Sequence, residues 1–421
     1  MNDMKYGMKY GVSIIGSILR PFYGVMAKKD SQPNPEMGSS ATKQLLSSST
    51  TTATKKAAPS DTQLKIRNSY QRLLWMVVGI VLIHLLVLLV VEFIRPDWNH
   101  VDYALRLQRL HKLISENPEK PIGIALGSSR TSMGLDTTTL SRLSNTNLFT
   151  LAFPGSGPVQ ELMYLQRLIA DGVRPNYVII EILPGMLFNP ISDLQPIIEN
   201  ENRANLSWDG IGMRDLSLLE RYHDPDVNVL FHFFLTRPEI IRGHGNDWLM
   251  LFESKWSFVE TGSKHNRFGF DDHGWLPYTT STFSEERKMR GVQQAKENYY
   301  GTLQKGEMGT RSPLAYEELL SWLQDHHLPY YLYLMPEGNT FRSWYNPSCE
   351  AQLQNWLKRI HDKYSAVIID TRTWMPDEAF FDSHHLLPNF GTVFAQRFGQ
   401  EILIPFLQHR GLLSHADTKS R

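Results

Sequence analysis

One apolar run constrains this chain more than any other feature of its sequence. Residues 73–94 read LLWMVVGIVLIHLLVLLVVEFI, with His84 and Glu92 as the strongly polar interruptions. About 20 apolar residues in helical form are needed to cross the hydrocarbon core of a bilayer. Trp75 and Trp98 flank the run, where interfacial aromatic anchors are expected. The sequence therefore predicts one transmembrane helix over 73–94, with a buried core helix as the alternative.

The charges on the two sides of this run predict its orientation. The first 72 residues contain 11 Lys or Arg and 4 Asp or Glu, although the whole chain has 43 of each kind and a formal net charge of +0. Lys65, Arg67 and Arg72 directly precede the run. Basic residues favour the cytoplasmic side, so we expect a cytoplasmic N-terminus and a periplasmic or extracellular C-terminal part. The balanced total charge gives no indication of a nucleic-acid partner.

The segments around the span differ in composition. Residues 1–29 are basic and include a short apolar stretch, which either lies on the inner membrane surface or is disordered. Residues 30–62 are rich in Ser, Thr and Ala and predict a disordered linker. Residues 99–410 form the predicted extracytoplasmic domain, followed by a tail at 411–421. A single cysteine, Cys349, excludes an intramolecular disulfide.

Strand-like and helix-like patterns alternate along this domain. Such alternation predicts right-handed β-α-β crossovers and an α/β fold with a doubly wound, parallel, five-stranded sheet. Residues 186–311 interrupt the rhythm without a clear period, and we expect them to form an inserted cap or long loops near the site. The predicted strands are 121–127, 147–153, 176–183, 329–335 and 365–370, and the predicted helices are 99–116, 158–171, one opening at Ser312-Pro313, one opening at Asn346-Pro347, and 388–408.

A serine follows the first predicted strand. Gly127-Ser128-Ser129-Arg130 stands where that strand gives way to a helix. A hydroxyl at this position is exposed, and the N–H groups of the next helix can stabilise an oxyanion. A plain strand-to-helix turn is the alternative.

A second pair of polar residues precedes the last predicted helix. Asp382 stands three residues before His385. A carboxylate there can bind the Nδ1–H of the imidazole and leave Nε2 free to accept a proton from a serine. The alternatives are a helix-capping segment or, in principle, a metal site, but no third and fourth ligand lie at typical spacing. We therefore expect no metal and no cofactor.

These two pieces together resemble the SGNH hydrolases, also called GDSL-type lipases, over about residues 118–410. The resemblance implies a flavodoxin-like three-layer fold, with Ser129 as the nucleophile, His385 as the base and Asp382 as the acid. It also implies an oxyanion-hole glycine after the second strand, for which Gly155 and Gly157 are the candidates in Phe153–Pro158. A glycine turn required by backbone geometry alone is the alternative.

The third sequence block of that family is not matched. Glu181-Ile182-Leu183-Pro184-Gly185-Met186 follows the third strand, where the family usually has an asparagine that donates to the oxyanion. Asn189 comes slightly late in the sequence. Either Asn189 or another donor replaces that asparagine, or the oxyanion hole is incomplete, at a typical loss of about 10²–10³ in rate.

Charged residues near the predicted site suggest how a substrate could be held. Arg130 adjoins the nucleophile, and Glu337, Arg342 and Tyr345 follow the fourth strand. Two arginines could bind a carboxylate or sugar acid. The alternative is an Arg–Glu ion pair that orders the loop, for instance Arg342 with Glu337. The aromatic residues of 268–275 either stack on sugar rings or form an ordered loop core.

The chain looks most similar to the membrane-anchored members that accompany membrane-bound O-acyltransferases. That resemblance implies a serine esterase or O-acyltransferase that acts on ester-linked acyl groups of an extracytoplasmic glycan or lipid-linked substrate. It also implies the bilayer and a membrane-bound O-acyltransferase as partners. A catalytically weak, polysaccharide-binding adaptor of an envelope assembly complex is the alternative, which the missing asparagine favours and the Ser/His/Asp trio opposes.

Overall fold

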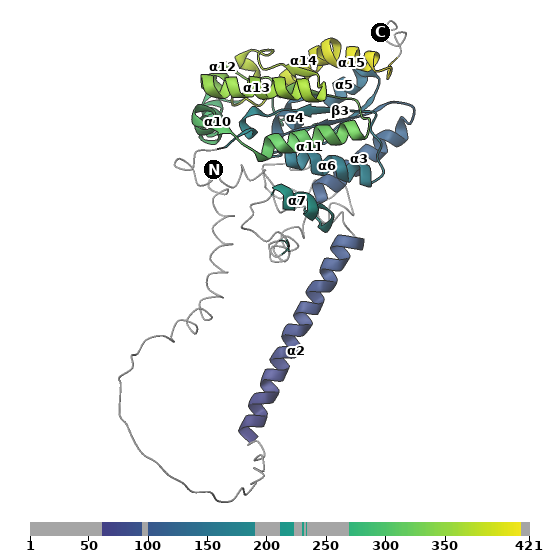
Figure 1. Cartoon of the computed structure of the whole chain (residues 1–421), viewed down its shortest axis with the longest axis vertical. Helices are drawn as coiled ribbons and strands as arrows, with labels where there is room; N and C mark the ends of the chain where they lie inside the picture. The colour runs from purple at the N-terminus through teal and green to yellow at the C-terminus, as the bar shows by residue number, and fades with distance from the viewer. Residues whose placement is uncertain are drawn as a thin grey trace, which may run out of the picture. The chain divides into compact units, whose positions relative to one another are not determined.

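A computed structural model describes residues 61–94, 100–189, 211–222, 230, 233 and 269–413. Helix α2 (Asp61–Leu89) continues into a π-helical turn at Val90–Ile94, and its residues Ser69–Phe93 are long and apolar enough to cross a membrane (Figure 1). Its side chains Trp75, Ile83 and Leu86 are exposed, unlike those of a buried core helix. Asp61 and Thr62, predicted as linker, belong to α2. Residues 1–29 and the rest of 30–62 lie outside the described residues, as does the tail from residue 414.

Five parallel strands form the central sheet in the order β2-β1-β3-β6-β7. All five predicted strands are confirmed, and each is shorter than predicted: β2 ends early, at Thr150, and β7 begins late, at Ile368. Ile124 of β1 lies between Phe149 of β2 and Val178 of β3 in register. The bounds are β1 Ile122–Leu126, β2 Asn147–Thr150, β3 Tyr177–Glu181, β6 Tyr330–Leu334 and β7 Ile368–Asp370.

The predicted helices are also present. Thr310 caps α11, not the predicted Ser312, which lies inside the first turn. Asn346 does cap α13, since its side chain accepts a hydrogen bond from the Cys349 N–H. The bounds are α3 Val101–Glu116, α4 Ser129–Gly134, α5 Thr137–Ser144, α6 Pro158–Ala170, α11 Arg311–Asp325, α12 Asn339–Arg342, α13 Pro347–Tyr364, α14 Pro388–Phe398, a π-helical turn Gly399–Leu403 and α15 Ile404–His409.

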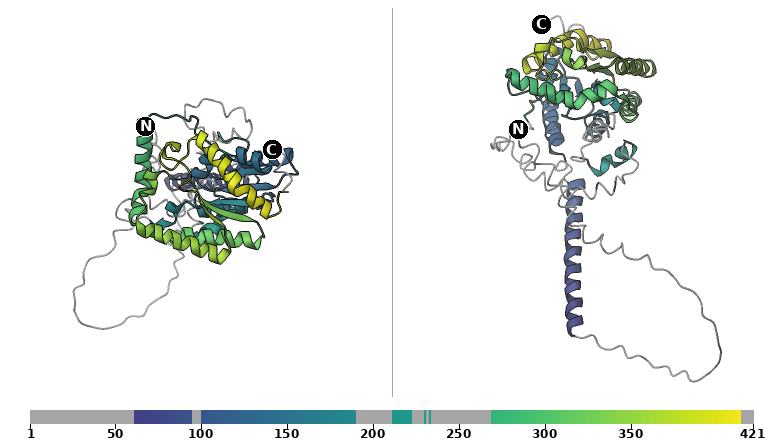
Figure 2. Two further views of the ribbon diagram at one scale, coloured as in Figure 1. Left: turned by 90° about the horizontal axis from the view of Figure 1, so that it is seen from above. Right: turned by 90° about the vertical axis from the view of Figure 1, so that its left-hand side faces the viewer.

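Alternate side chains of the strands enter two separate hydrophobic clusters. Ile124 and Ile180 belong to the cluster that includes Leu165 of α6, while Ala125 and Tyr331 belong to the one that includes residues of α14. Burial on both sides explains why the strands read as continuous apolar runs. Figure 2 shows the sheet and its helices from two further directions.

The predicted insertion, 186–311, contains regular structure that its sequence pattern does not reveal. Phe188–Asn189 (β4) pairs antiparallel with Glu307–Met308 (β5), Leu216–Tyr222 forms α7, and Glu285–Lys305 forms the long helix α10. Helix α10 carries few apolar residues and two internal glycines, Gly291 and Gly301. A sparse apolar face gives little periodic signal. Residues 190–210, 223–229, 231–232 and 234–268 lie outside the described residues.

Candidate active site

The proposed nucleophile lies in a tightly built turn after β1. Ser129 is the first residue of α4, and Ser128 caps that helix by accepting a hydrogen bond from the Arg130 N–H at 3.2 Å. Gly127 leaves no space for a side chain, because an added Cβ would lie 2.5 Å from Thr131 Oγ1 and 2.6 Å from a Glu181 carboxylate oxygen. Glycine is therefore required sterically at this turn. Ser129 itself is half-buried.

Ser129, His385 and Asp382 come together at the carboxyl edge of the sheet. His385 Nε2 lies 2.8 Å from Ser129 Oγ, and His385 Nδ1 lies 2.7 Å from Asp382 Oδ2. The Asp382 carboxylate also accepts the backbone N–H of His385 at 2.8 Å. With Nδ1 protonated towards Asp382, Nε2 accepts the serine hydroxyl proton. Residues 256 positions apart in sequence thus form a hydrogen-bonded chain.

Electrostatics keep Asp382 ionised. Burial alone would raise the pKa of this carboxyl, but attraction to His384 and His385 and their hydrogen bonds outweigh burial and hold the pKa well below its usual value. The neighbouring His384 is buried, which lowers its pKa, and its ring stacks on Phe341 at 5.1 Å. The backbone N–H of His384 donates to Asp382 Oδ1 at 3.2 Å, so His384 also supports the acid through its main chain.

The loop that carries His385 is held by the segment after β6. Ser383 has a φ of 71°, an uncommon conformation for a residue other than glycine. Its carbonyl accepts the Gly338 N–H at 2.8 Å, and its hydroxyl accepts the Phe341 N–H at 3.0 Å. These bonds fix the turn between Asp382 and His385.

Glu181, at the end of β3, is the functional residue that the sequence reasoning missed. It is fully buried, and one carboxylate oxygen accepts hydrogen bonds from the Ser128 N–H (2.8 Å), the Ser128 hydroxyl (3.0 Å) and the Thr131 hydroxyl (2.7 Å). These bonds hold the turn around Ser129, which we call the nucleophile turn, against β3. A charged residue inside the apolar run VIIEIL is the sequence signal that could have identified it, because buried carboxylates need partners.

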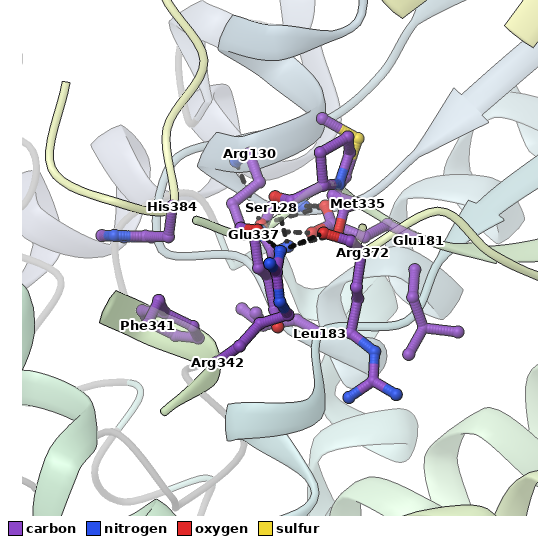
Figure 3. Close-up of polar contacts among 12 residues, drawn as sticks. Ser128, Arg130, Glu181, Leu183, Met335, Glu337, Phe341, Arg342, Arg372 and His384 are labelled. Carbon is purple, nitrogen blue, oxygen red and sulfur yellow. Dashed lines mark hydrogen bonds and ion pairs between the residues drawn. The ribbon is translucent and has the colours of Figure 1, made fainter. Parts of the chain in front are cut away.

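Of the residues predicted to bind substrate, Arg130 and Glu337 are buried and bonded to one another (Figure 3), and Arg342 and Tyr345 are half-buried beside them. Arg130 is 1% exposed; it donates to Glu337 Oε1 at 3.0 Å and to the Met335 carbonyl at 2.7 Å, and its Nε lies 3.7 Å from Glu181. Tyr345 donates to the same Glu337 oxygen at 3.0 Å, and Arg342 donates to the Glu337 carbonyl. The ion-pair alternative therefore describes these residues, with Arg130 as the main partner of Glu337.

The candidate oxyanion donors lie in three different segments of the fold. The Ser129 N–H has no acceptor among the described residues, and the Phe153 N–H donates to the Gly127 carbonyl at 3.3 Å, which lays the turn after β2 beside the nucleophile turn. Gly155 has a φ of 80°, so its conformation favours glycine in any case. Gly157 is buried and caps α6. Asn189 lies in β4, and its side chain is outside the described part. All four remain predicted donors.

Asp382, His384 and His385 are also the one group, among the described residues, whose ligand atoms could hold a metal ion, since these atoms lie within 4.8 Å of one another. In the hydrogen-bonded arrangement, His385 Nδ1 faces Asp382 and Nε2 faces Ser129. A metal at His385 would have to replace one of these contacts.

Helix α10 packs directly on the loop that carries Asp382. An added Cβ on Gly291 would lie 2.9 Å from the Phe381 ring and 3.0 Å from Asp382 Cβ, whereas Gly301 in the same helix has open space. We expect Gly291→Ala to destabilise the protein by about 1–3 kcal/mol through overpacking. Gly301→Ala should instead stabilise it by up to about 1 kcal/mol through helix propensity. Chemical denaturation of both variants tests this; equal effects would contradict the close contact.

A second buried carboxyl, Glu161 in α6, lies beneath the site. Burial, together with repulsion by Glu181, raises its pKa well above the usual value, and its Oε2 has no partner among the described residues. A raised pKa in the folded state means that stability is fully present below the unfolded pKa and falls as pH rises, by about 1.4 kcal/mol per pH unit until the folded group ionises.

Glu161→Gln removes this titration. We expect the variant to be more stable than the parent at pH 7 and to lose the decline in stability above pH about 4.5, near the ordinary glutamate pKa. Urea unfolding between pH 4 and 8 measures both effects. A variant that is less stable at pH 7, with an unchanged pH profile, would show that Glu161 is ionised and stabilising.

Two comparisons with known proteins bear on the site. A family model described as a protein of unknown function, DUF1574, matches residues 74–209. The match extends from the apolar helix through β3 and includes Ser129 and Glu181, but it ends before Asp382 and His385. No curated protein matches the chain.

Proposed function

We propose that this chain is a membrane-anchored serine esterase or O-acyltransferase of the SGNH type. The proposal is carried by one observation: Ser129 Oγ, His385 and Asp382 are linked by contacts of 2.8 and 2.7 Å. The strand order supports it: the chain builds the sheet outwards from β1, first to β2 on one side and then to β3, β6 and β7 on the other. Flavodoxin-like doubly wound sheets have the same order, and their sites form at the carboxyl ends of the strands where the order switches.

The reaction begins when Ser129 Oγ attacks the carbonyl carbon of an ester. His385 Nε2 takes the hydroxyl proton as the Oγ–C bond forms, and Asp382 stabilises the resulting imidazolium. The oxyanion receives hydrogen bonds from the Ser129 N–H and from a donor in the turn at Gly155 or Gly157. His385 then protonates the leaving alcohol oxygen as the C–O bond breaks, which leaves an acyl group on Ser129.

The second half-reaction repeats these steps in reverse with another acceptor. His385 removes a proton from water or from a sugar hydroxyl, and the new oxygen attacks the acyl-serine carbonyl. Water gives an esterase, and a sugar hydroxyl gives a transferase. The length and apolar composition of α2 support the proposed membrane anchor, and the basic residues before it support a cytoplasmic N-terminus with the domain on the other side. An extracytoplasmic glycan or lipid-linked ester is the substrate class that fits.

Labelling with a fluorophosphonate probe tests this function on the full chain in detergent. The parent should be labelled, and both Ser129→Ala and His385→Ala should lose the label. Ser281→Ala and His409→Ala, both at exposed positions, serve as matched controls and should be labelled like the parent. An unlabelled parent that still binds polysaccharide would favour the adaptor function instead.

A further inference from the structure

Three aromatic rings pack against one another beside the proposed catalytic histidine, and one of them contacts it. Tyr278 lies edge-on to His385 with ring centroids 6.4 Å apart, and it contacts Phe283 at 5.4 Å and Phe381 at 5.2 Å. Phe283 and Phe381 also contact one another, at 4.6 Å. All three rings are half-buried. We call Tyr278, Phe283 and Phe381 the aromatic wall.

The wall is held by the segment that precedes it. The Leu276 N–H donates to the Ser132 carbonyl of α4 at 2.8 Å, and the Trp275 indole donates to the Met133 carbonyl at 2.8 Å. Phe270 in the same segment is buried beneath Arg106 and Arg109. The aromatic residues of 269–275 thus form an ordered loop core, and this core fixes Tyr278 next to the helix that bears the nucleophile.

An exposed cation extends the wall. The guanidinium carbon of Arg287 lies 4.7 Å from the centroid of the Phe283 ring. Arg287 precedes Gly291 by four residues, so the two share a face of α10, and Gly291 touches Phe381 and Asp382. Neighbouring Glu285 and Glu286 pair with Lys288 and Arg290. No carboxylate of the described residues pairs with Arg287.

The geometry points to a subsite for an anionic sugar residue of the substrate at the aromatic wall, with Arg287 binding the negative group. The flat C–H face of a pyranose packs on aromatic rings, and a guanidinium binds carboxylate or phosphate through paired N–H groups. An acyl chain would bring no charge to match Arg287. The subsite rests on the proposed function for its role, because a sugar held there has its ester beside Ser129 and His385.

Binding to the Ser129→Ala full chain tests the subsite without requiring catalysis. The probes are three sugar polymers: polygalacturonate (carboxylate), phosphomannan (phosphate) and xylan (neutral). We expect at least one polyanion to bind more tightly than xylan, and the better of the two identifies the anionic group. Arg287→Gln should weaken that binding about tenfold, and Arg287→Lys should recover part of the loss. Arg290→Gln removes an equal charge from a nearby position of α10. It should have little effect, because Arg290 already pairs with Glu286.

The outcomes separate the two proposals. Equal losses in Arg287→Gln and Arg290→Gln would show nonspecific charge attraction and overturn the subsite, as would binding of xylan that matches the polyanions. Failure of fluorophosphonate labelling together with Arg287-dependent binding would overturn the esterase and leave the subsite intact. Labelling at Ser129 together with binding that does not change in Arg287→Gln would overturn the subsite and leave the esterase intact.

Discussion

Replacing His385 by Ala should lower kcat for hydrolysis of p-nitrophenyl acetate by about 10⁴-fold or more, because no other base among the described residues contacts Ser129 Oγ. His385 Nε2 is the base atom that lies 2.8 Å from Ser129 Oγ. Asp382→Asn should cost about 10⁴-fold in kcat, since an amide stabilises neither the required tautomer nor the imidazolium. Steady-state kinetics of the full chain in detergent measure both values.

The effects of His385→Ala and Asp382→Asn on kcat should not be additive. Ser129, His385 and Asp382 act as one unit, so the double variant should be no slower than His385→Ala alone. His409→Ala, at an exposed position on α15, is the control for loss of an imidazole. Kinetics in which His385→Ala retains more than a tenth of the parent activity would contradict the assignment of the base.

Replacing Arg130 by Met should destabilise the fold by about 3–5 kcal/mol, because it leaves buried carboxylates without their cation. Arg130 and Glu337 are 1% and 0% exposed, and the same guanidinium also lies near Glu181. The network joins the nucleophile turn to β3 and to the loop after β6. Urea unfolding of the full chain in detergent measures the loss.

A second substitution distinguishes charge from shape in this network. Arg130→Met combined with Glu337→Gln removes one unpaired charge and should recover part of the lost stability. Arg397→Met breaks an exposed pair with Glu401 and should cost no more than about 1 kcal/mol. Equal effects of Arg130→Met and Arg397→Met would show that the buried network contributes little.

The sheet could be predicted because its strands are buried on both sides. β1 and β6 are apolar runs, β3 is apolar up to Glu181, and the helices between these strands have apolar faces, so the local pattern agrees with the fold. Helix α10 could not be predicted in the same way. It is largely exposed, and its contact with Asp382 depends on the absence of a side chain at Gly291, which no periodicity reveals.

Only part of the site could be predicted. Ser129 could be predicted from its position after the first strand, and Asp382 and His385 from their spacing before the last helix, because the two pieces together resemble one family. The role of Arg130 could not be predicted, because the sequence shows a cation beside a nucleophile but not the burial that turns it inward to Glu337. Glu181 was visible as a charge in a strand, yet its partners, Ser128 and Thr131, lie about 50 positions away.

Trapping the acyl-enzyme tests the central claim most directly. The full chain is mixed rapidly with p-nitrophenyl acetate, quenched in acid and digested, and the acetylated peptide is located by mass spectrometry. The account predicts a burst of nitrophenol and an acetyl group on Ser129, neither of which forms in Ser129→Ala. Turnover of the ester with the acetyl group on another side chain, or with Ser129→Ala as active as the parent, would contradict it.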